Sequence, residues 1–405
     1  MISFLFSGAL WIFPFSNKPD KFLNKEVYVV FKIISIPNDY NVKNISLANL
    51  NSIDNLPVFL KAKVVDYSKR INFLDSYSAV VKLKKIKNGY FVFIKKNTYL
   101  VKLPISLFDR FRRKAINFML SNFKKNLTEE AYRFLSSVFL GRRELLTKEE
   151  KFIFINTGTI HLLAISGLHI GIWSLILLYF LKIFNIKFKI RIIISLASLF
   201  VYTFIIGAPP SAIRAFVIYA VFCFSFLLKR KVVSLNSLGL SGLVILFIWP
   251  FSVFDIGFWL SFICVFSLII YSHFLNFNFS NFFINIFFSS IFINLFINPI
   301  LSLYFKRLYI LNIFYNIILI PLFSLILFVN FLLIIFPINI FSIPTGKVLS
   351  FLIYIFNRIS LFFSNFKFNF INYKMPLPLF FIYYIILGFI LFFIYFKKID
   401  KRLKF

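Results

Sequence analysis

Two histidines and a serine stand close together where a long apolar run begins. His161, Ser166 and His169 lie within 159–171, and the whole chain has only 3 histidines. A serine three residues before a histidine can approach it, so this spacing permits nucleophilic Ser/His chemistry. No acidic residue accompanies the pair in sequence to orient the imidazole. A packed helix whose histidines are satisfied by neighbours explains the same spacing, and both interpretations stay open.

The apolar run around these residues predicts a membrane helix over about 160–181. His161 and His169 fall on one face of that helix, because residues four apart stack. Gly167 and Gly171 leave a flat strip where another backbone can approach closely. Since polar groups in a bilayer-length helix must face protein or water, we expect this face to point inward.

The composition places the chain in a membrane. Of its residues 60% are hydrophobic, and several apolar runs reach the roughly 20 residues that span a bilayer. The three histidines are too few for a binuclear zinc hydrolase or nuclease, and no Gly-rich ATPase loop is present. We therefore expect no metal site and no cofactor. Cys223 and Cys264 lie in apolar runs, which favours buried thiols over a disulfide framework.

The distribution of charge is more informative than its total. The formal net charge is +32, but an AT-rich coding sequence also favours lysine, so sign alone argues weakly for a polyanionic partner. Between Glu150 and Asp400 the only acidic residue is Asp255. A carboxylate at the mouth of a span is costly unless paired or hydrated. An ion pair with Arg214 is one expectation, and separate hydration of the two groups is the other.

The segment around Arg214 also predicts a helix start. Pro209 and Pro210 break the backbone, and Ser211 is a suitable N-cap residue. A helix N-terminus at membrane depth attracts anions.

The region before the membrane helices has a different character. Short β-branched and aromatic runs occur at 26–34, 58–65, 78–86 and 90–94, and Asn88-Gly89 is a two-residue hairpin signal. Five or six such strands suit a small β-barrel of the oligonucleotide/oligosaccharide-binding (OB) type. The predicted hairpin is basic and aromatic, a combination typical of single-strand nucleic-acid binding. Its candidate DNA-binding residues are Lys82, Lys84, Lys85, Lys87, Tyr90, Phe91, Phe93, Lys95 and Lys96. A solvated outer face explains the lysines equally well.

The sequence thus predicts a polytopic α-helical membrane protein with a small extracytoplasmic OB-like β domain. Residues 1–16 lack a convincing cleavage site and predict an uncleaved membrane anchor. The other segments are the β domain at 17–107, amphipathic and connecting helices at 108–158, a multi-span channel domain at 159–396 and a basic tail at 397–405. A capping box at Thr147 to Glu150 starts one of the connecting helices.

Eight runs are candidate spans, namely 160–181, 191–206, 211–228, 235–250, 254–273, 281–304, 309–336 and 377–396. Basic residues at 182–191, 229–231 and 397–404 should be cytoplasmic, which places 17–158 outside. Lys347 and Arg358 among apolar residues predict an amphipathic surface helix over 347–364. The Asn- and Ser-rich stretch 276–298 fits a re-entrant or interfacial segment.

The residues at 158–171 (GTIHLLAISGLHIG) closely resemble the signature of the ComEC competence proteins, the inner-membrane channels for DNA uptake. Further blocks follow the family order: GRRELLT (141–147), GAPPSAIRA (207–215), WP (249–250), DIGFWLSF (255–262), FKRL (305–308) and NIILIP (316–321). The resemblance covers about 128–336. It implies that the pore or helix-packing positions are His161, Ser166, Gly167, His169, Gly171, Pro210, Ser211, Arg214, Asp255, Trp259 and Ser261.

The resemblance implies a channel that passes single-stranded DNA through the cytoplasmic membrane in natural transformation. Many family members carry a metallo-β-lactamase-like nuclease domain, which this sequence lacks, so removal of the second strand would fall to a separate nuclease. The lipid bilayer, a periplasmic DNA-binding receptor protein and a cytoplasmic helicase or ATPase are the other expected partners. A transporter of another anion and an intramembrane Ser/His enzyme remain the alternatives.

Overall fold

The computed structural model describes Leu23 and residues 26–403, except 34–37, 40–43, 54–55, 68–70, 72–74, 87–88, 96, 105, 164, 229–233 and 276–281. The anchor predicted over 1–16 lies outside the described residues. The chain forms two compact units. A strand unit comprises the chain up to Phe123 together with 133–146, and a helical unit comprises 124–132 and the chain from Thr147 onward.

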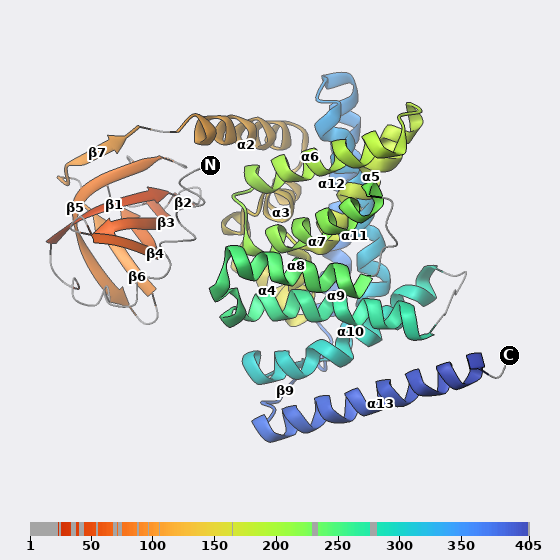
Figure 1. Ribbon diagram of the computed structural model, residues 1–405. Helices are drawn as coiled ribbons and strands as arrows, with labels where there is room; N and C mark the ends of the chain where they lie inside the picture. Colours follow the sequence, from red (N-terminus) through yellow and green to blue (C-terminus); the bar gives the residue numbers. More distant parts are fainter. Residues whose placement is uncertain are drawn as a thin grey trace. The chain divides into compact units, whose positions relative to one another are not determined.

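The strand unit is a small mixed sheet (Figure 1). Its strands are β1 (Glu26–Ile33), β2 (Asn38–Asp39), β3 (Asn44–Ile53), β4 (Leu56–Asp66), β5 (Ser76–Ile86), β6 (Gly89–Ile94) and β7 (Leu100–Leu103). The pairings run β1–β3–β4–β6–β5, and β1 also pairs with β5, so five strands are linked in a ring. All these pairings are antiparallel except β4–β6, which is parallel. This arrangement agrees with the predicted OB-like domain.

Alternating side chains give this ring its core. Along β1 the residues Val27, Val29, Phe31 and Ile33 are buried, since every second side chain of a strand points to the same face. Strand β5 repeats the pattern: Leu83 is fully buried, whereas the lysines on either side of it are exposed. The sheet is therefore apolar inside and basic outside.

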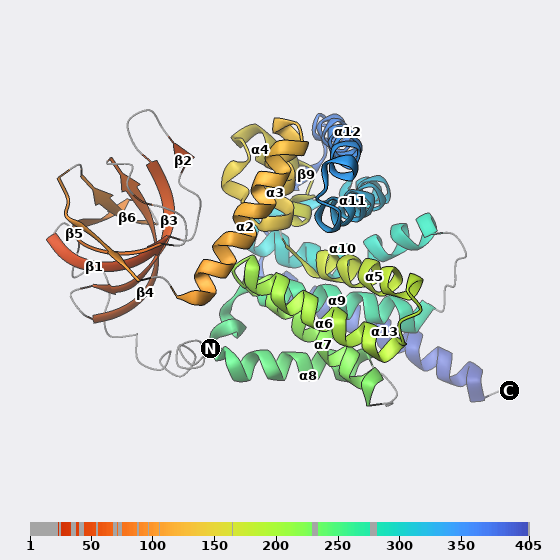
Figure 2. The ribbon, with the colours of Figure 1, turned by 90° about the horizontal axis from the view of Figure 1, so that it is seen from above.

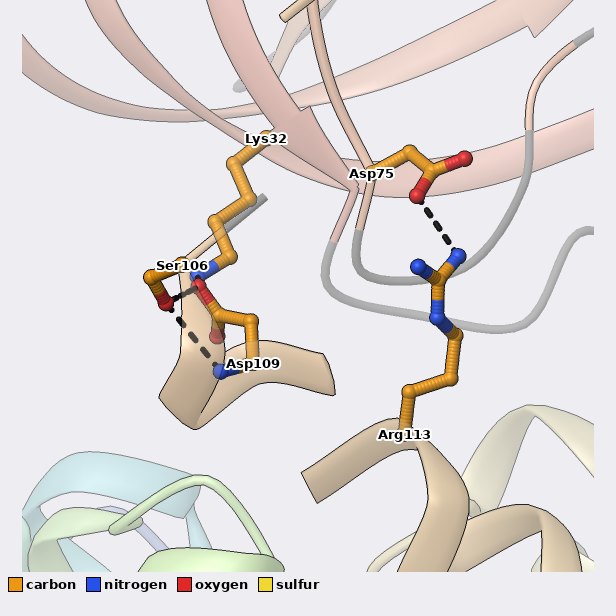
Figure 3. A network of polar contacts seen from close by, with 5 residues as sticks. All are labelled: Lys32, Asp75, Ser106, Asp109 and Arg113. Carbon is orange, nitrogen blue, oxygen red and sulfur yellow. Dashed lines mark hydrogen bonds and ion pairs between the residues drawn. The ribbon is translucent and has the colours of Figure 1, made fainter. Parts of the chain in front are cut away.

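The first helix of the strand unit is tied to the strands by ion pairs (Figure 3). Helix α2 (Leu107–Asn126) follows Ser106, whose hydroxyl oxygen accepts the Asp109 N–H at 3.1 Å. The Lys32 ammonium lies 2.6 Å from Asp109, and the Arg113 guanidinium lies 2.6 Å from the fully buried carboxylate of Asp75. These contacts fix the start of α2 against β1 and the loop before β5. Helix α3 (Glu129–Leu140) comes next in the chain.

The helical unit contains α4 (Lys148–Asn156), α5 (Gly167–Ile183), α6 (Phe188–Ile205), α7 (Pro210–Leu227), α8 (Ser234–Ile248), α9 (Ile256–Leu275), α10 (Phe282–Phe305), α11 (Asn312–Ile335), α12 (Asn339–Ser364) and α13 (Leu377–Leu403). Two short strands, β8 (Arg307–Tyr309) and β9 (Phe370–Asn372), pair within it. Helices α6, α7, α10, α11 and α12 are long and apolar enough to cross a membrane, and α5, α8, α9 and α13 contain shorter apolar stretches. The predicted capping box is confirmed, because Thr147 and Glu150 exchange hydrogen bonds of 2.7 and 3.1 Å at the start of α4.

Helix α12 is longer and more apolar than the amphipathic surface helix predicted over 347–364. The helix begins at Asn339, and its length and composition suit a span better than an amphipathic surface helix. Its polar residues are covered from within the unit: Ser350 accepts the Thr128 N–H at 3.2 Å, and Asn357 donates to Glu130 at 2.7 Å. The polar positions that suggested a surface helix therefore face a neighbouring protein segment.

Candidate functional site

The signature segment forms a short turn followed by a capped helix. The Ser166 N–H donates to Nδ1 of His169 at 3.3 Å, and the Ser166 hydroxyl oxygen lies 3.2 Å from the same nitrogen. Nδ1 thus faces both the backbone N–H and the hydroxyl of the residue that precedes α5. The ring is buried and packs edge-on against Phe323 of α11, with 5.1 Å between centroids. His169 thus closes the first turn of α5 and joins it to α11.

The expectation that His161 and His169 share one face of a single helix is wrong. His161 lies in a separate 3-10 turn, Ile160–Leu163, and its Nδ1 is 3.2 Å from the Gly158 carbonyl oxygen. Helix α5 begins only at Gly167, because the Ser166 cap starts a new helix there. The two histidines therefore have separate local roles.

Gly158 fixes the path of the chain into the signature. Its φ is +72°, and a Cβ atom at this position would lie 2.5 Å from the ring of Tyr309. The Tyr309 hydroxyl donates to the Ile155 carbonyl oxygen at 2.9 Å, so the ring is held over the glycine. Only glycine satisfies both constraints.

The starts of α5 and α7 lie against each other. The Ser211 hydroxyl donates to the Ile165 carbonyl oxygen at 2.7 Å, and a Cβ at Gly167 would meet Ala215 at 3.9 Å. Helix α7 begins with Pro210 at its first position after an N-cap at Pro209, so the predicted capping role of Ser211 is wrong and its hydroxyl serves α5 instead. The close helix approach predicted at Gly171 is also absent, since a Cβ there would meet no described atom within 4 Å.

Arg214 joins α7 to the start of α9. Its guanidinium donates to Asp255 at 3.3 Å and to the Ser261 hydroxyl at 3.2 Å, which confirms the predicted ion pair. Asp255 precedes α9 and accepts the Gly257 N–H at 3.0 Å. Arg214 is buried, whereas the Asp255 side chain is 47% exposed. Trp259 is anchored to the preceding turn by a 2.8 Å hydrogen bond to the Val253 carbonyl oxygen.

These contacts join the start of α7 to the start of α5 and, through the buried Arg214, to the start of α9. The first turns of α5, α7 and α9 each present partial positive charge, and the Arg214 guanidinium adds a full one. Asp255 offsets part of this charge from its exposed position. Such a junction favours an anion near its surface.

The same contacts bear on the Ser/His alternative. Asp255, the one acidic residue between Glu150 and Asp400, pairs with Arg214 and with no histidine among the contacts described. His169 directs Nδ1 to the backbone and hydroxyl of Ser166 as a helix cap. Within the described part of the chain, no three His, Cys, Asp or Glu side chains form a group that could hold a metal ion.

The family block at 141–147 forms a turn in the strand unit. Gly141 has a φ of +71°. The next residue, Arg142, is buried, and its guanidinium lies 3.7 Å from the Glu144 carboxylate. Burial lowers the pKa of Arg142 to about 10, and the negative charge of Glu144 opposes this shift. The guanidinium therefore remains protonated at neutral pH, as an internal fixed charge of this unit.

The β5–β6 hairpin places basic and aromatic residues on one outer face. Lys82 lies opposite Phe93, and Lys84 lies opposite Phe91. The two phenylalanine rings stack at 6.3 Å, and the Lys84 ammonium lies 5.8 Å from the Phe93 centroid. A lysine that the sequence reasoning missed completes this face: Lys63 of β4 lies 5.6 Å from the Phe91 centroid. We call Lys63, Lys82, Lys84, Phe91 and Phe93 the basic aromatic face.

The other predicted DNA-binding residues are less well placed. Lys85 and Tyr90 pair in register across the hairpin, but their side chains lie outside the described residues, as do Lys87 and Lys96. Lys95 is exposed just after β6, where its N–H donates to Thr98 at 2.9 Å. No contact joins Lys95 to the basic aromatic face among the interactions described.

Comparison with known proteins identifies the helical region. The family model described as "Competence protein" matches residues 138–397, more than half of the chain. An uncharacterized protein of Aquifex aeolicus (strain VF5) is 28% identical over 222 residues, which are 53% of this chain and 52% of that protein. ComE operon protein 3 of Bacillus subtilis (strain 168) is 39% identical over 129 residues, 32% of this chain and 16% of the relative.

The chain therefore spans about half the length of the first relative and a much smaller share of the second. No solved structure matches the chain. Within the described part of the chain, the family match covers every helix that is long and apolar enough to cross a membrane. The chain belongs to the Competence protein family and is a multi-pass protein of the inner membrane.

Proposed function

We propose that this protein takes part in DNA uptake for competence by passing single-stranded DNA through the inner membrane. The observation that carries the proposal is the connection of α7 to the start of α5 through Ser211 and to the start of α9 through the buried Arg214, inside the Competence region. Three helix N-termini and a buried guanidinium form a site that attracts a polyanion. The resemblance to ComEC proteins supplies the substrate class.

The rest of the membrane region is compatible with a polyanionic substrate. Asp255 is the one acidic residue between Glu150 and Asp400, and its charge is offset by Arg214. A lining rich in carboxylates would repel phosphates, whereas this sequence offers one paired carboxylate. The electrostatics thus support an anionic cargo.

The basic aromatic face gives the strand unit a matching role. Two stacked phenylalanine rings offer surfaces for bases, and Lys63, Lys82 and Lys84 offer charges for phosphates. Base–aromatic stacking contributes about 1–3 kcal/mol per base and tolerates any sequence. We propose that this face binds the incoming strand without sequence preference.

The proposed partners follow from what the pathway needs. No ATPase loop occurs in this sequence, so a cytoplasmic helicase or ATPase would pull the strand. A periplasmic DNA-binding receptor would deliver the DNA, and a separate nuclease would remove the second strand.

A complementation experiment tests the proposal. The gene is deleted in its own organism and restored as wild type, Arg214→Gln or Arg358→Gln, with membrane levels matched by immunoblot. Arg358 is an exposed arginine of α12 that stacks on Tyr354 of the same helix, so it serves as the control. Fluorescent DNA distinguishes arrest at the cell surface from entry into the cytosol.

We expect the deletion and Arg214→Gln strains to bind DNA outside without importing it, and Arg358→Gln to import normally. Normal transformation of the deletion strain would overturn the proposal and leave smaller anions as the substrates to test.

A further inference from the structure

Helix α11 carries three asparagines on one buried stripe. Asn312, Asn316 and Asn330 are separated by one turn and by about four further turns, so all three point to the same side of the helix. Asn312 and Asn316 are 7% exposed, and Asn330 is fully buried. We call these residues the amide stripe.

Four amide atoms of the stripe lack a hydrogen-bond partner in the described part of the chain. Among the described residues, no partner reaches Oδ1 of Asn312, Oδ1 of Asn316, or either polar atom of the Asn330 side chain. A buried amide without a partner costs about 1–3 kcal/mol by mutational measures. By contrast, Asn294 on α10 donates to the Ser290 carbonyl oxygen at 2.8 Å. The missing partners of the amide stripe, grouped on one side of one helix, therefore need a reason.

The position of the stripe connects it to the signature segment. Phe323, between Asn316 and Asn330 on the same side of α11, contacts the ring of His169. Tyr309, just before α11, covers Gly158. Farther along, Phe331 packs at 5.1 Å against Trp173 of α5. The stripe thus begins beside the signature segment and follows α5 away from it.

The neighbours of α11 show that the stripe lies inside the helical unit. Figure 2 shows α12 beside α11, and Tyr315 stacks on Phe363 at 4.2 Å. The opposite side of α11 carries the exposed Leu325 and Phe328. The exposed apolar side is expected to face lipid, whereas the inner side sets the amides among the buried Leu319, Phe323 and Ile326.

We propose that the amide stripe lines the route of the DNA strand, which is closed in this structure and opens in competent cells; this inference rests on the proposed function. From Asn312 to Asn330 the stripe is about 27 Å long, close to the thickness of the hydrocarbon core. Amides donate to phosphate oxygens and accept from base amino groups, yet carry no net charge. Conduction needs contacts weak enough to release the strand, which suits amides better than lysine or arginine.

Cysteine accessibility tests the route. With Cys223 and Cys264 replaced by alanine, Asn316→Cys and Asn330→Cys are each exposed to a small, charged, membrane-impermeant thiol reagent in competent cells. Leu325→Cys and Phe328→Cys on the opposite side of the same helix are the matched controls. We expect the reagent to modify both stripe positions, to spare the controls, and to lose access when a DNA strand is arrested in transit.

Absence of modification at both stripe positions overturns the inference. Modification that arrested DNA does not reduce also overturns it as a strand route. If the deletion strain transforms normally while the stripe is modified, the proposed substrate has failed separately, because the labelling then reports a polar route for another solute.

A second variant separates lining from packing. Asn330→Leu removes a buried amide without partners, so we expect equal or higher thermal stability in detergent but loss of DNA import per molecule in the membrane. Asn294→Leu, which breaks a satisfied hydrogen bond on α10, should lower stability and leave import per molecule unchanged. Unchanged import by Asn330→Leu would assign the stripe to packing and contradict the proposal.

Discussion

The two units bury opposite kinds of side chain. In the strand unit, Leu83 is buried between exposed lysines, as in a water-soluble domain. In helix α11, Asn330 is fully buried while Phe328 is 44% exposed. A unit in water buries its apolar side chains, because their transfer out of water is favourable. Membrane helices can expose apolar side chains to lipid and must place polar ones inside. A polar residue therefore carries more functional information inside the helical unit than on the strand unit.

The largest expected loss of stability comes from placing a charge in the apolar core of the strand unit. We expect Leu83→Asp to destabilise the unit by more than about 4 kcal/mol, because an unpaired carboxylate would be buried. Val80→Asp, on the same strand but 55% exposed, should change stability by less than about 0.5 kcal/mol. Limited proteolysis of the full-length protein in detergent measures both, and equal protection of residues 26–103 in the two variants would contradict the burial pattern.

A steric test gives the next largest effect, in the helical unit. Gly158→Val should lower stability by about 3 kcal/mol or more, because a side chain at positive φ would also clash with Tyr309. Gly171→Ala, in open space within α5, should raise stability by about 0.5–1 kcal/mol. Thermal melting in detergent compares them. Similar losses in both variants would mean that the turn before the signature is not specially constrained.

The ion pair at the three helix starts tests whether buried charge in the helical unit needs its partner. Asp255→Asn should destabilise by about 1 kcal/mol, since it leaves Arg214 buried but its own site is half exposed and screened. Adding Arg214→Gln should recover part of that loss, giving a coupling of about 0.5–1 kcal/mol. A double-mutant cycle of melting in detergent measures this coupling, and strict additivity would show that the pair does not interact energetically.

The smallest effect concerns surface charge on the strand unit. We expect Lys84→Gln to weaken single-stranded DNA binding and to reduce the magnitude of the salt slope by about 0.7, the value for one lost phosphate contact on a single strand. Lys148→Gln, an exposed lysine of α4, is the control. Fluorescence anisotropy of the full-length protein in nanodiscs over a salt series measures the slope. An unchanged slope for Lys84→Gln would show that Lys84 makes no phosphate contact.

Sequence patterns predicted local features of both units well. Alternation in 78–86 and the Asn-Gly turn signal located the β5–β6 hairpin, because strand burial has a period of two. The near absence of other charges in the region made the Arg214–Asp255 pair one of two expectations, and the structure contains it. Lys63 was missed, because only the parallel pairing of β4 with β6 places it beside Phe91. Non-local pairing leaves no signal in a single sequence.

In the helical unit, helix boundaries were predicted less well than in the strand unit. By length and hydropathy the run over 160–181 was taken as one span, so the turn at His161 and the new helix that starts after Ser166 were not predicted. In α12, polar residues suggested contact with water, whereas segment 124–132 covers them. The spacing of Asn312, Asn316 and Asn330 is present in the sequence but was not used there. Only the structure shows that these asparagines are buried with amide atoms that lack hydrogen-bond partners among the described residues.

The ring of strand pairings also sets the order in which the strand unit can fold. Glu26 of β1 lies opposite Lys82 of β5, so the ring closes only after β5 has been synthesised. At 5–20 residues per second, translation of the intervening chain takes about 3–11 s. During this interval β1 and β3 can form a hairpin, but one edge of β1 stays unpaired and open to other chains. The strand unit should therefore depend on chaperones more before β5 emerges than after it.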